Sequence, residues 1–278
     1  MEKYPRDKHA PDIKIWDEVF RGLDLSYSED TKTQAKLFEY FKIDFLKEIY
    51  PPPPLTTLEV GCGTAYISLF FAKRGYLATC LDINPKILKI AQKNFTKEGI
   101  RAKFVLADAS HLPFKNCQFD IVTSFGLLEH FHNPAPIINE MSRVLKKRGL
   151  FFADIVPKRF SCQSLGNMFN AFASFIYWST RGKLHQAINK AKRNFQPLYF
   201  ENDINFENYR KIMQSAGITN IHIRGNRPFP RLTLPTSIDQ IYTRLLKLTL
   251  PAWKVFDRWD NNLARHWGAG LWFWGTKS

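Results

Sequence analysis

The chain has 278 residues, of which 45% are hydrophobic and 23% are charged, and these values exclude a fibrous or largely disordered protein. Four cysteines without a C-x-x-C pair exclude a disulfide scaffold and argue against a structural zinc site. The first 16 residues lack the apolar core of a secretion signal, and no apolar run reaches 18 residues. We therefore expect a cytoplasmic protein without a membrane-spanning helix.

The positive charge is concentrated in one part of the chain. The net charge is +15, and residues 157–232 contribute +9 of it, from 12 basic and 3 acidic side chains. Such asymmetry indicates an acidic partner, which could be a phosphate-bearing substrate, nucleic acid or an anionic membrane surface. A solubility charge on an inserted cap explains the same numbers equally well.

The first half of the chain alternates between helical and strand patterns. Apolar positions at steps of three and four predict a helix over 31–49, which the four prolines at 51–54 terminate. Further helices are expected at 65–73, from Pro85 onward and at 137–147, and strands are expected at 55–60, 76–83, 102–107, 119–125 and 150–156. This order predicts an α/β fold with a Rossmann-like, seven-stranded, mostly parallel sheet and helices on both faces.

The alternation stops after residue 156. Residues 157–200 are rich in aromatic and basic side chains, and we interpret them as a cap insertion. A helix at 206–215 and a strand at 218–224 follow. Residues 237–267 are predicted to form two amphipathic helices separated by Pro251, and a short strand at 271–274 follows them.

Polar and glycine residues follow three of the predicted strands. Gly61 and Gly63 come directly after the first strand, where they allow the backbone to approach a ligand at a helix N-terminus. Asp82 ends the second strand, where a carboxylate can accept hydrogen bonds from ribose hydroxyls, and Asp108 follows the third. Because parallel strands end at one edge of a sheet, these groups predict a nucleoside site.

A nicotinamide dinucleotide site is the competing interpretation of the glycine pair. Its fingerprint requires a third glycine, three residues after the second. Here that position is Tyr66, whose bulk would block a pyrophosphate. An acidic residue two positions before the first glycine, Glu59, is also foreign to that pattern.

Residues 55–156 resemble the class I S-adenosylmethionine-dependent methyltransferases, in the small-molecule group that includes quinone-biosynthesis enzymes. The resemblance is carried by L-E-V-G-C-G-T at 58–64, L-D-I-N at 81–84, D-A-S-H-L-P-F at 108–114 and L-E-H at 128–130. It implies methyl transfer by in-line displacement, with S-adenosylhomocysteine as the product and no metal ion. The cofactor-binding residues that it implies are Glu59, Gly61, Cys62, Gly63, Asp82, Ile83, Asp108, Ala109 and Phe125.

The resemblance also implies a role for each part of this set. The two glycines would lie beside the methionine portion, and Glu59 would orient its amino group. Asp82 would hold the ribose, and Asp108 with Ala109 would hold the adenine. The backbone around Phe125 would face the sulfonium.

His130 and Glu129 are the candidate catalytic residues, because they follow the fourth strand at the edge of the expected pocket. His130 could act as a general base, since imidazole titrates near neutral pH. The alternative is that both side chains fix the loop by hydrogen bonds. Some relatives bind a metal through E-x-x-E-H in this loop, but the first position here is Gly126.

Three further features allow two interpretations each. Tyr27 could close over the cofactor as part of an N-terminal lid, or it could pack in the core. The aromatic stretch at 169–178 could be ordinary cap packing or an apolar acceptor tunnel. The C-terminal helices combine tryptophans with basic residues, a mixture typical of interfacial helices, although core packing is the commoner explanation; the residues concerned are Trp253, Lys254, Arg258, Trp259, Arg265 and Trp267.

We predict four parts: an N-terminal helical lid (1–50), the cofactor-binding core (51–156), a basic aromatic cap (157–204), and a completion of the sheet with added helices (205–278). The predicted function is methyl transfer to a small acceptor that is hydrophobic, lipid-like or acidic. The alternative enzyme is a tRNA methyltransferase that uses the basic cap. The non-enzymatic alternative is a scaffold that binds the cofactor without catalysis. An anionic membrane surface fits the cap better than nucleic acid, because no RNA-binding signature is present.

Overall fold

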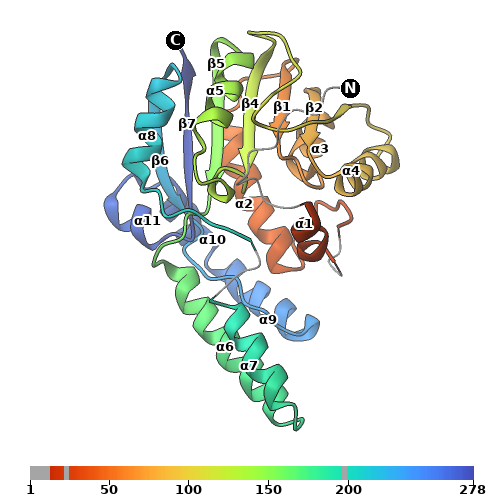
Figure 1. Cartoon of the computed structure of the whole chain (residues 1–278), viewed down its shortest axis with the longest axis vertical. Coiled ribbons are helices and arrows are strands. Elements are labelled where there is room, and N and C mark those ends of the chain that lie inside the picture. The colour runs from red at the N-terminus through yellow and green to blue at the C-terminus, as the bar shows by residue number, and fades with distance from the viewer. Residues whose placement is uncertain (1–12, 22–24, 196–198) are drawn as a thin grey trace.

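The structure is a computed structural model that describes residues 13–21, 25–195 and 199–278. Within these ranges a single seven-stranded sheet forms the centre of the molecule (Figure 1). Its order is β3-β2-β1-β4-β5-β7-β6, and only β7 runs antiparallel to its neighbours. This arrangement confirms the predicted fold class. The strands are β1 (Thr56–Val60), β2 (Leu77–Asp82), β3 (Lys103–Leu106), β4 (Phe119–Phe125), β5 (Leu145–Ile155), β6 (Ile218–Asn226) and β7 (Gly270–Lys277).

Helices cover both faces of the sheet, as expected for parallel strands. One face packs against α2 (Gln34–Ile49), α3 (Tyr66–Ala72) and α4 (Pro85–Lys97). The other face packs against α5 (Ala135–Val144) and α8 (Phe206–Ser215). Buried apolar side chains therefore form a separate core on each side of the strands.

Local capping explains where the first helices begin. The Thr33 side chain accepts a hydrogen bond from the Lys36 N–H at the start of α2. The Asn84 side chain caps α4, and Pro85 occupies its first turn, where a missing N–H costs nothing. α2 ends at Ile49 with an extended Tyr50, just before the four prolines.

The helix predicted at 137–147 is shorter than expected. α5 ends at Val144, and Leu145 already pairs with Phe119 as the first residue of β5. The register of this strand pair shifts between Phe119 and Ile121, and Arg148 adopts a positive φ of 59°. The extra residues at 146–149 are therefore a bulge in a strand rather than the last turn of a helix.

The second half of the chain adds five helices within the described ranges. They are α6 (Cys162–Ser179), α7 (Leu184–Arg193), α9 (Thr236–Leu248), α10 (Leu250–Arg258) and α11 (Asn262–Trp267). The two helices predicted in 237–267 are thus three. Trp259 is extended at the end of α10, and the Asn261 side chain caps α11 by accepting from the Ala264 N–H. Pro251 lies in the first turn of α10, where proline is tolerated.

Helices α6 and α7 form a hairpin that projects away from the sheet, and α9 lies at the same end of the molecule (Figure 1). Helices α9 and α10 pack against α2 through a small third core. Its centre is Trp253, which is fully buried and stacks on Phe41 at 3.9 Å between ring centroids.

Candidate functional site

The loop after β1 is built around two glycines in left-handed conformation. Gly61 has φ +68° and Gly63 has φ +53°. The Cys62 N–H donates to the Leu81 carbonyl (2.9 Å), which ties this turn to the end of β2. A Cβ on Gly63 would project toward the Phe20 ring, 3.9 Å from its Cζ atom. Glycine at this position therefore leaves open space beside the turn.

Asp82 at the end of β2 organises the same turn. Its Oδ2 accepts from the Gly63 N–H (2.8 Å) and its Oδ1 accepts from the Asn84 N–H (2.9 Å). Burial raises the pKa of this carboxyl above its usual value. Each carboxylate oxygen has a second lone pair, so Asp82 can still accept from ligand hydroxyls.

Two neighbouring groups complete this side of the site. Asp108 follows β3, and its Oδ1 accepts from the N–H and the hydroxyl of Ser110, both at 2.8 Å, so its second oxygen keeps its acceptor capacity. Glu59 in β1 is buried, and its Oε2 accepts from the Ser68 N–H (3.1 Å) and hydroxyl. Burial raises the Glu59 pKa to about 7.

A buried charge cluster lies behind Phe125 at the end of β4. Lys42 of α2 has its Nζ 5.2 Å from the centroid of the Phe125 ring. The same Nζ lies 3.1 Å from an oxygen of Asp154, which is only 2% exposed and also lies 3.5 Å from Arg227. The cluster explains the carboxylate that the sequence places inside an apolar strand, since a buried charge requires partners.

His130 and Glu129 occupy a short 3₁₀ turn, η1 (Leu128–His130), and have different surroundings. The Nδ1 atom of His130 lies 2.8 Å from the Phe200 carbonyl oxygen. Because a carbonyl oxygen only accepts, Nδ1 carries the proton in this hydrogen bond and Nε2 carries a lone pair. Burial lowers the His130 pKa, which keeps the ring neutral at pH 7.

Glu129 points away from the open space. It is 1% exposed, and its Oε1 accepts from the Val156 N–H (3.0 Å). Its backbone carbonyl accepts from the Asn202 N–H (2.7 Å). Burial raises the Glu129 pKa to about 7. These contacts hold the loop, but the buried Oε2 atom has no hydrogen-bond partner among the described residues, and a part of Glu129 in the chemistry stays a prediction.

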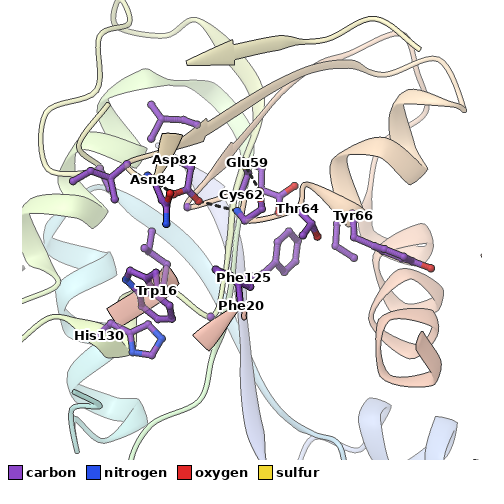
Figure 2. Close-up of a pocket in the computed structure, with 18 of the residues that line it drawn as sticks. Trp16, Phe20, Glu59, Cys62, Thr64, Tyr66, Asp82, Asn84, Phe125 and His130 are labelled. Carbon is purple, nitrogen blue, oxygen red and sulfur yellow. Dashed lines mark hydrogen bonds between the residues drawn. The ribbon is translucent and has the colours of Figure 1, made fainter. Parts of the chain in front are cut away.

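The N-terminal covering of the site comes from α1 (Ile13–Val19) and the residue after it. Asp17 accepts from the Asn84 side chain (3.0 Å) and pairs with Lys86, which fixes α1 at the start of α4. Trp16 then contacts the His130 ring edge-on at 4.7 Å between centroids. Figure 2 shows Trp16 beside His130, with Asp82 next to Asn84.

Of the two interpretations of Tyr27, the structure agrees with packing in the core. Its ring packs against Tyr66 at 4.9 Å in the core beside α3, its hydroxyl donates to Glu29 (2.8 Å), and it is not among the cavity-lining residues. Trp16 and Phe20 cover the cavity instead. Their spacing of four residues on a helix is a signal that sequence reasoning could have used.

The predicted site residues other than Tyr27 and Glu129 border one cavity of ≈ 280 Å³ at the carboxyl edge of the sheet (Figure 2). The structure brings together ten of the predicted site residues: Glu59, Gly61, Cys62, Gly63, Asp82, Ile83, Asp108, Ala109, Phe125 and His130. The lining also includes residues that the sequence did not single out, among them Trp16, Phe20, Glu39 and Lys42. Lys42 and Glu39 come from a helix whose pattern alone gives no sign of which polar face meets a cavity.

The C-terminal tryptophan and arginine residues are not arranged as one interfacial face. Trp253 is buried, and Lys254 and Arg258 both form ion pairs with Asp44 on α2 (3.0 and 3.1 Å). Arg265 pairs with Asp260. The basic residues are therefore used within the fold, whereas Trp259 and Trp267 are exposed, and the interfacial interpretation of α10 and α11 stays a prediction.

The described residues contain neither a candidate metal cluster nor a candidate membrane-spanning helix. In the part of the chain that the structure describes, no group of three or more histidine, cysteine or acidic side chains could hold a metal ion. Over the same residues, no helix has the length and apolar character required to cross a bilayer.

Comparison with known proteins gives the same picture of the core. Residues 58–153 match the model of a methyltransferase domain family. A ubiquinone biosynthesis O-methyltransferase of Xylella fastidiosa is 27% identical over 118 residues, 42% of this chain and 48% of that protein. A demethylmenaquinone methyltransferase of Thermotoga maritima is 28% identical over 190 residues, 64% of this chain and 76% of that protein.

The solved structures agree with the fold. A phosphoethanolamine N-methyltransferase 2 of Haemonchus contortus, in complex with S-adenosyl-L-methionine, superposes with a TM-score of 0.55 at 15% identity. The match covers 95% of this chain and 56% of that one. The fold is that of the class I S-adenosylmethionine-dependent methyltransferases, and the match to a methyltransferase domain covers residues 58–153. In this core the chain is similar to quinone-biosynthesis methyltransferases. It spans about half the length of most of the curated relatives that it matches.

The residues present fit the cofactor of this family. A Cβ on Gly63 would fill the space beside the turn, so glycine is required if a ligand lies there. Asp82 offers carboxylate oxygens at the end of β2, and the α3 N-terminus begins just beyond the glycines. S-adenosylmethionine is therefore the cofactor that this cavity suits.

Proposed function

We propose that this protein transfers a methyl group from S-adenosylmethionine to a small, mainly apolar acceptor by in-line displacement. The supporting observation is a cavity whose lining combines polar groups at the strand ends with aromatic side chains. The glycine turn and Asp82 line it together with the rings of Trp16, Phe20, Phe125 and His130. A donor and an apolar acceptor could therefore meet in one space that excludes water.

At the donor end, the residues have the roles that the family resemblance implies. Asp82 would accept from the ribose hydroxyls, and Asp108 with Ala109 would hold the adenine. Glu59 would bind the amino group of the methionine portion. The bound cofactor supplies an electrophilic methyl group on a sulfonium, which is itself a good leaving group. The protein then needs mainly to position the acceptor, at a distance of about 3 Å from the methyl carbon.

The aromatic part of the lining, where we place the acceptor, favours a flat apolar molecule. Trp16 stacks on Tyr199 at 5.5 Å between centroids and presents its edge to His130. Phe20 and Phe125 extend this aromatic surface. The names of two relatives, a ubiquinone biosynthesis O-methyltransferase and a demethylmenaquinone methyltransferase, support a lipophilic acceptor. An anionic membrane surface is the partner at which such an acceptor would be met.

Lys42 gives the acceptor end a positive charge. Its side chain is 11% exposed, and its ammonium lies over the Phe125 ring, 3.1 Å from Asp154 and 3.5 Å from Glu39. A cation in this position would stabilise an acceptor oxygen that becomes negative when it loses its proton. We propose that Lys42 orients an acidic or ionised group of the acceptor.

His130 is the proposed general base. Its hydrogen bond to the Phe200 carbonyl oxygen leaves the lone pair on Nε2, and burial keeps the ring neutral. A neutral imidazole at the acceptor end could take the proton of an acceptor hydroxyl during methyl transfer.

The proposal is tested by incubating the purified protein with methyl-labelled S-adenosylmethionine and a panel of acceptors. The panel contains prenylated and short-chain hydroxyquinols, small carboxylic acids and unmodified tRNA. We expect label transfer to a lipophilic hydroxylated ring, and a Lys42→Met variant should lower the apparent affinity for acidic acceptors most. Transfer to tRNA alone would favour the RNA methyltransferase. Cofactor binding without transfer to any acceptor would favour a scaffold.

A further inference from the structure

The α6–α7 hairpin has an exposed apolar stripe on its longer helix. Leu165, Phe169, Phe172 and Ile176 follow one another at steps of three and four, which places them on one face of α6. Their exposed fractions range from 45% for Leu165 and Ile176 to 65% for Phe172. Folding thus leaves large apolar side chains in contact with water. A contiguous patch of this kind indicates an interaction site.

The root of this hairpin is firmly attached to the rest of the fold. The buried residues of α6 are Cys162, Gly166, Asn170 and Ala171, all in its first ten positions. The Asn170 side chain accepts from the Thr233 N–H (2.8 Å), and the Gln163 side chain accepts from the Arg231 N–H (2.7 Å). From residue 172 onward α6 has no buried residue and packs on α7. The exposed half is therefore a projection held by a fixed base.

The charge of the hairpin is of one sign. Residues 160–195 contain five basic side chains, Arg181, Lys183, Lys190, Lys192 and Arg193, and no aspartate or glutamate. All five are exposed, and two of them lie over aromatic rings at the tip, Arg181 over Tyr177 and Lys183 over Trp178. Aromatic rings beside basic heads, next to an apolar stripe, match the interface between lipid headgroups and acyl chains.

The hairpin also has a defined position relative to the cavity. It follows β5 directly in the chain, at the carboxyl end of that strand. The parallel strands β1, β2 and β4 end at the same edge, where the cavity lies. A surface that binds the hairpin would therefore approach the side of the molecule that carries the cavity.

We propose that the α6–α7 hairpin docks on an anionic lipid surface. The apolar stripe of α6 would enter the headgroup region, and the basic residues of α7 would contact acidic headgroups. Charge complementarity selects this partner over a neutral bilayer, since the hairpin has no acidic group to balance its five cations. Vesicle binding is measured without methyl transfer, so its result does not depend on the proposed function.

The test is co-sedimentation of the whole protein with vesicles of phosphatidylcholine alone or mixed with phosphatidylglycerol. We expect binding to the anionic vesicles and little to the neutral ones. The double variant Phe172→Ser/Ile176→Ser should bind at least about tenfold more weakly, because it removes buried apolar contacts with the lipid. Lys190→Ser/Arg193→Ser should lose about fivefold for each charge removed.

Two matched variants serve as controls away from the hairpin. Leu77→Ser removes an exposed leucine at the start of β2, and Lys93→Ser removes an exposed lysine on α4. Both should bind anionic vesicles like the wild type. Equal binding by the hairpin variants and these controls would overturn the proposal. The proposal would also be overturned if the wild-type protein did not bind vesicles but bound tRNA, in a salt-dependent manner, through the same hairpin residues.

Discussion

The carboxyl edge of the sheet and the α6–α7 hairpin depart from ordinary burial in opposite ways. The sheet edge buries carboxyl groups, and Glu59 and Glu129 both have pKa values raised to about 7 as a result. The hairpin instead exposes large apolar side chains such as Phe172. Each departure costs stability unless a ligand or partner compensates for it. We propose that the first departure serves the cofactor and the second serves a lipid surface.

The largest effect should come from closing the space at the sheet edge. Gly63→Val would place a side chain toward Phe20 and should weaken S-adenosylhomocysteine binding by about a hundredfold or more, equivalent to ~2.7 kcal/mol. Gly99→Val is the matched control, because Gly99 has φ +69° and its Cβ would meet nothing within 4 Å. Calorimetric titration with S-adenosylhomocysteine measures the affinity of both variants. Similar losses in both would mean that backbone strain, not lost space, explains the effect.

The next effect concerns the proposed base. His130→Ala should lower kcat by roughly 10²- to 10³-fold while S-adenosylhomocysteine still binds. His130→Gln keeps a donor for the Phe200 carbonyl and should be as slow, and the exposed His132→Ala should retain full rate. Because burial lowers the His130 pKa, the wild-type rate should fall with decreasing pH only below the usual histidine range. Unchanged kcat in His130→Gln would assign the ring to packing.

A smaller effect should appear in the pH dependence of stability. The folded protein holds a proton on Glu59 up to about pH 7, whereas the unfolded chain releases it near the usual carboxyl value. This contribution is present at low pH and is lost as pH rises through the folded pKa. Glu59→Gln should therefore gain stability over the wild type, on the order of 2 kcal/mol, between about pH 5 and pH 8.

Urea unfolding at both pH values measures this gain. The exposed Glu207→Gln serves as a control for the mere loss of a carboxylate. A constant difference between Glu59→Gln and wild type at the two pH values would contradict a raised Glu59 pKa.

The smallest effect should come from the hairpin. Phe172→Ser/Ile176→Ser should change the free energy of unfolding by less than about 0.5 kcal/mol, because these side chains are already exposed. Phe41→Ala, which removes a buried ring from under Trp253, should cost about 3–5 kcal/mol. A large loss in the hairpin variant would mean that the stripe is part of the core and would weaken the surface interpretation.

The sheet and the donor end of the cavity were predictable because their residues are dictated by local backbone requirements. Glycines at positive φ, a strand ending in Asp82 and a cap at Asn84 each have a short-range signal. The acceptor end was not predictable, because Lys42 and Trp16 reach the cavity only through tertiary packing of α2 and α1. The direction of the Glu129 side chain was not predictable either, since it depends on the distant Val156 N–H.

The hairpin shows a different limit of prediction from the sequence. The aromatic and basic composition of 157–200 was evident, but the small residues Cys162, Gly166 and Ala171 decide which side of α6 packs. The division of 250–267 into two helices depended on the Asn261 cap, a signal that the tryptophan periodicity obscured. The boundaries of the four predicted parts stay predictions.

The most direct test of the donor site is calorimetric titration of the wild type, Asp82→Ala and the exposed control Asp203→Ala with S-adenosylhomocysteine. We predict saturable one-to-one binding by the wild type and the control. In Asp82→Ala it should be weakened about a hundredfold, because two charge-assisted hydrogen bonds to the ribose are lost and the Gly63 N–H loses its acceptor. No binding by folded wild-type protein, or equal binding by Asp82→Ala, would contradict the account.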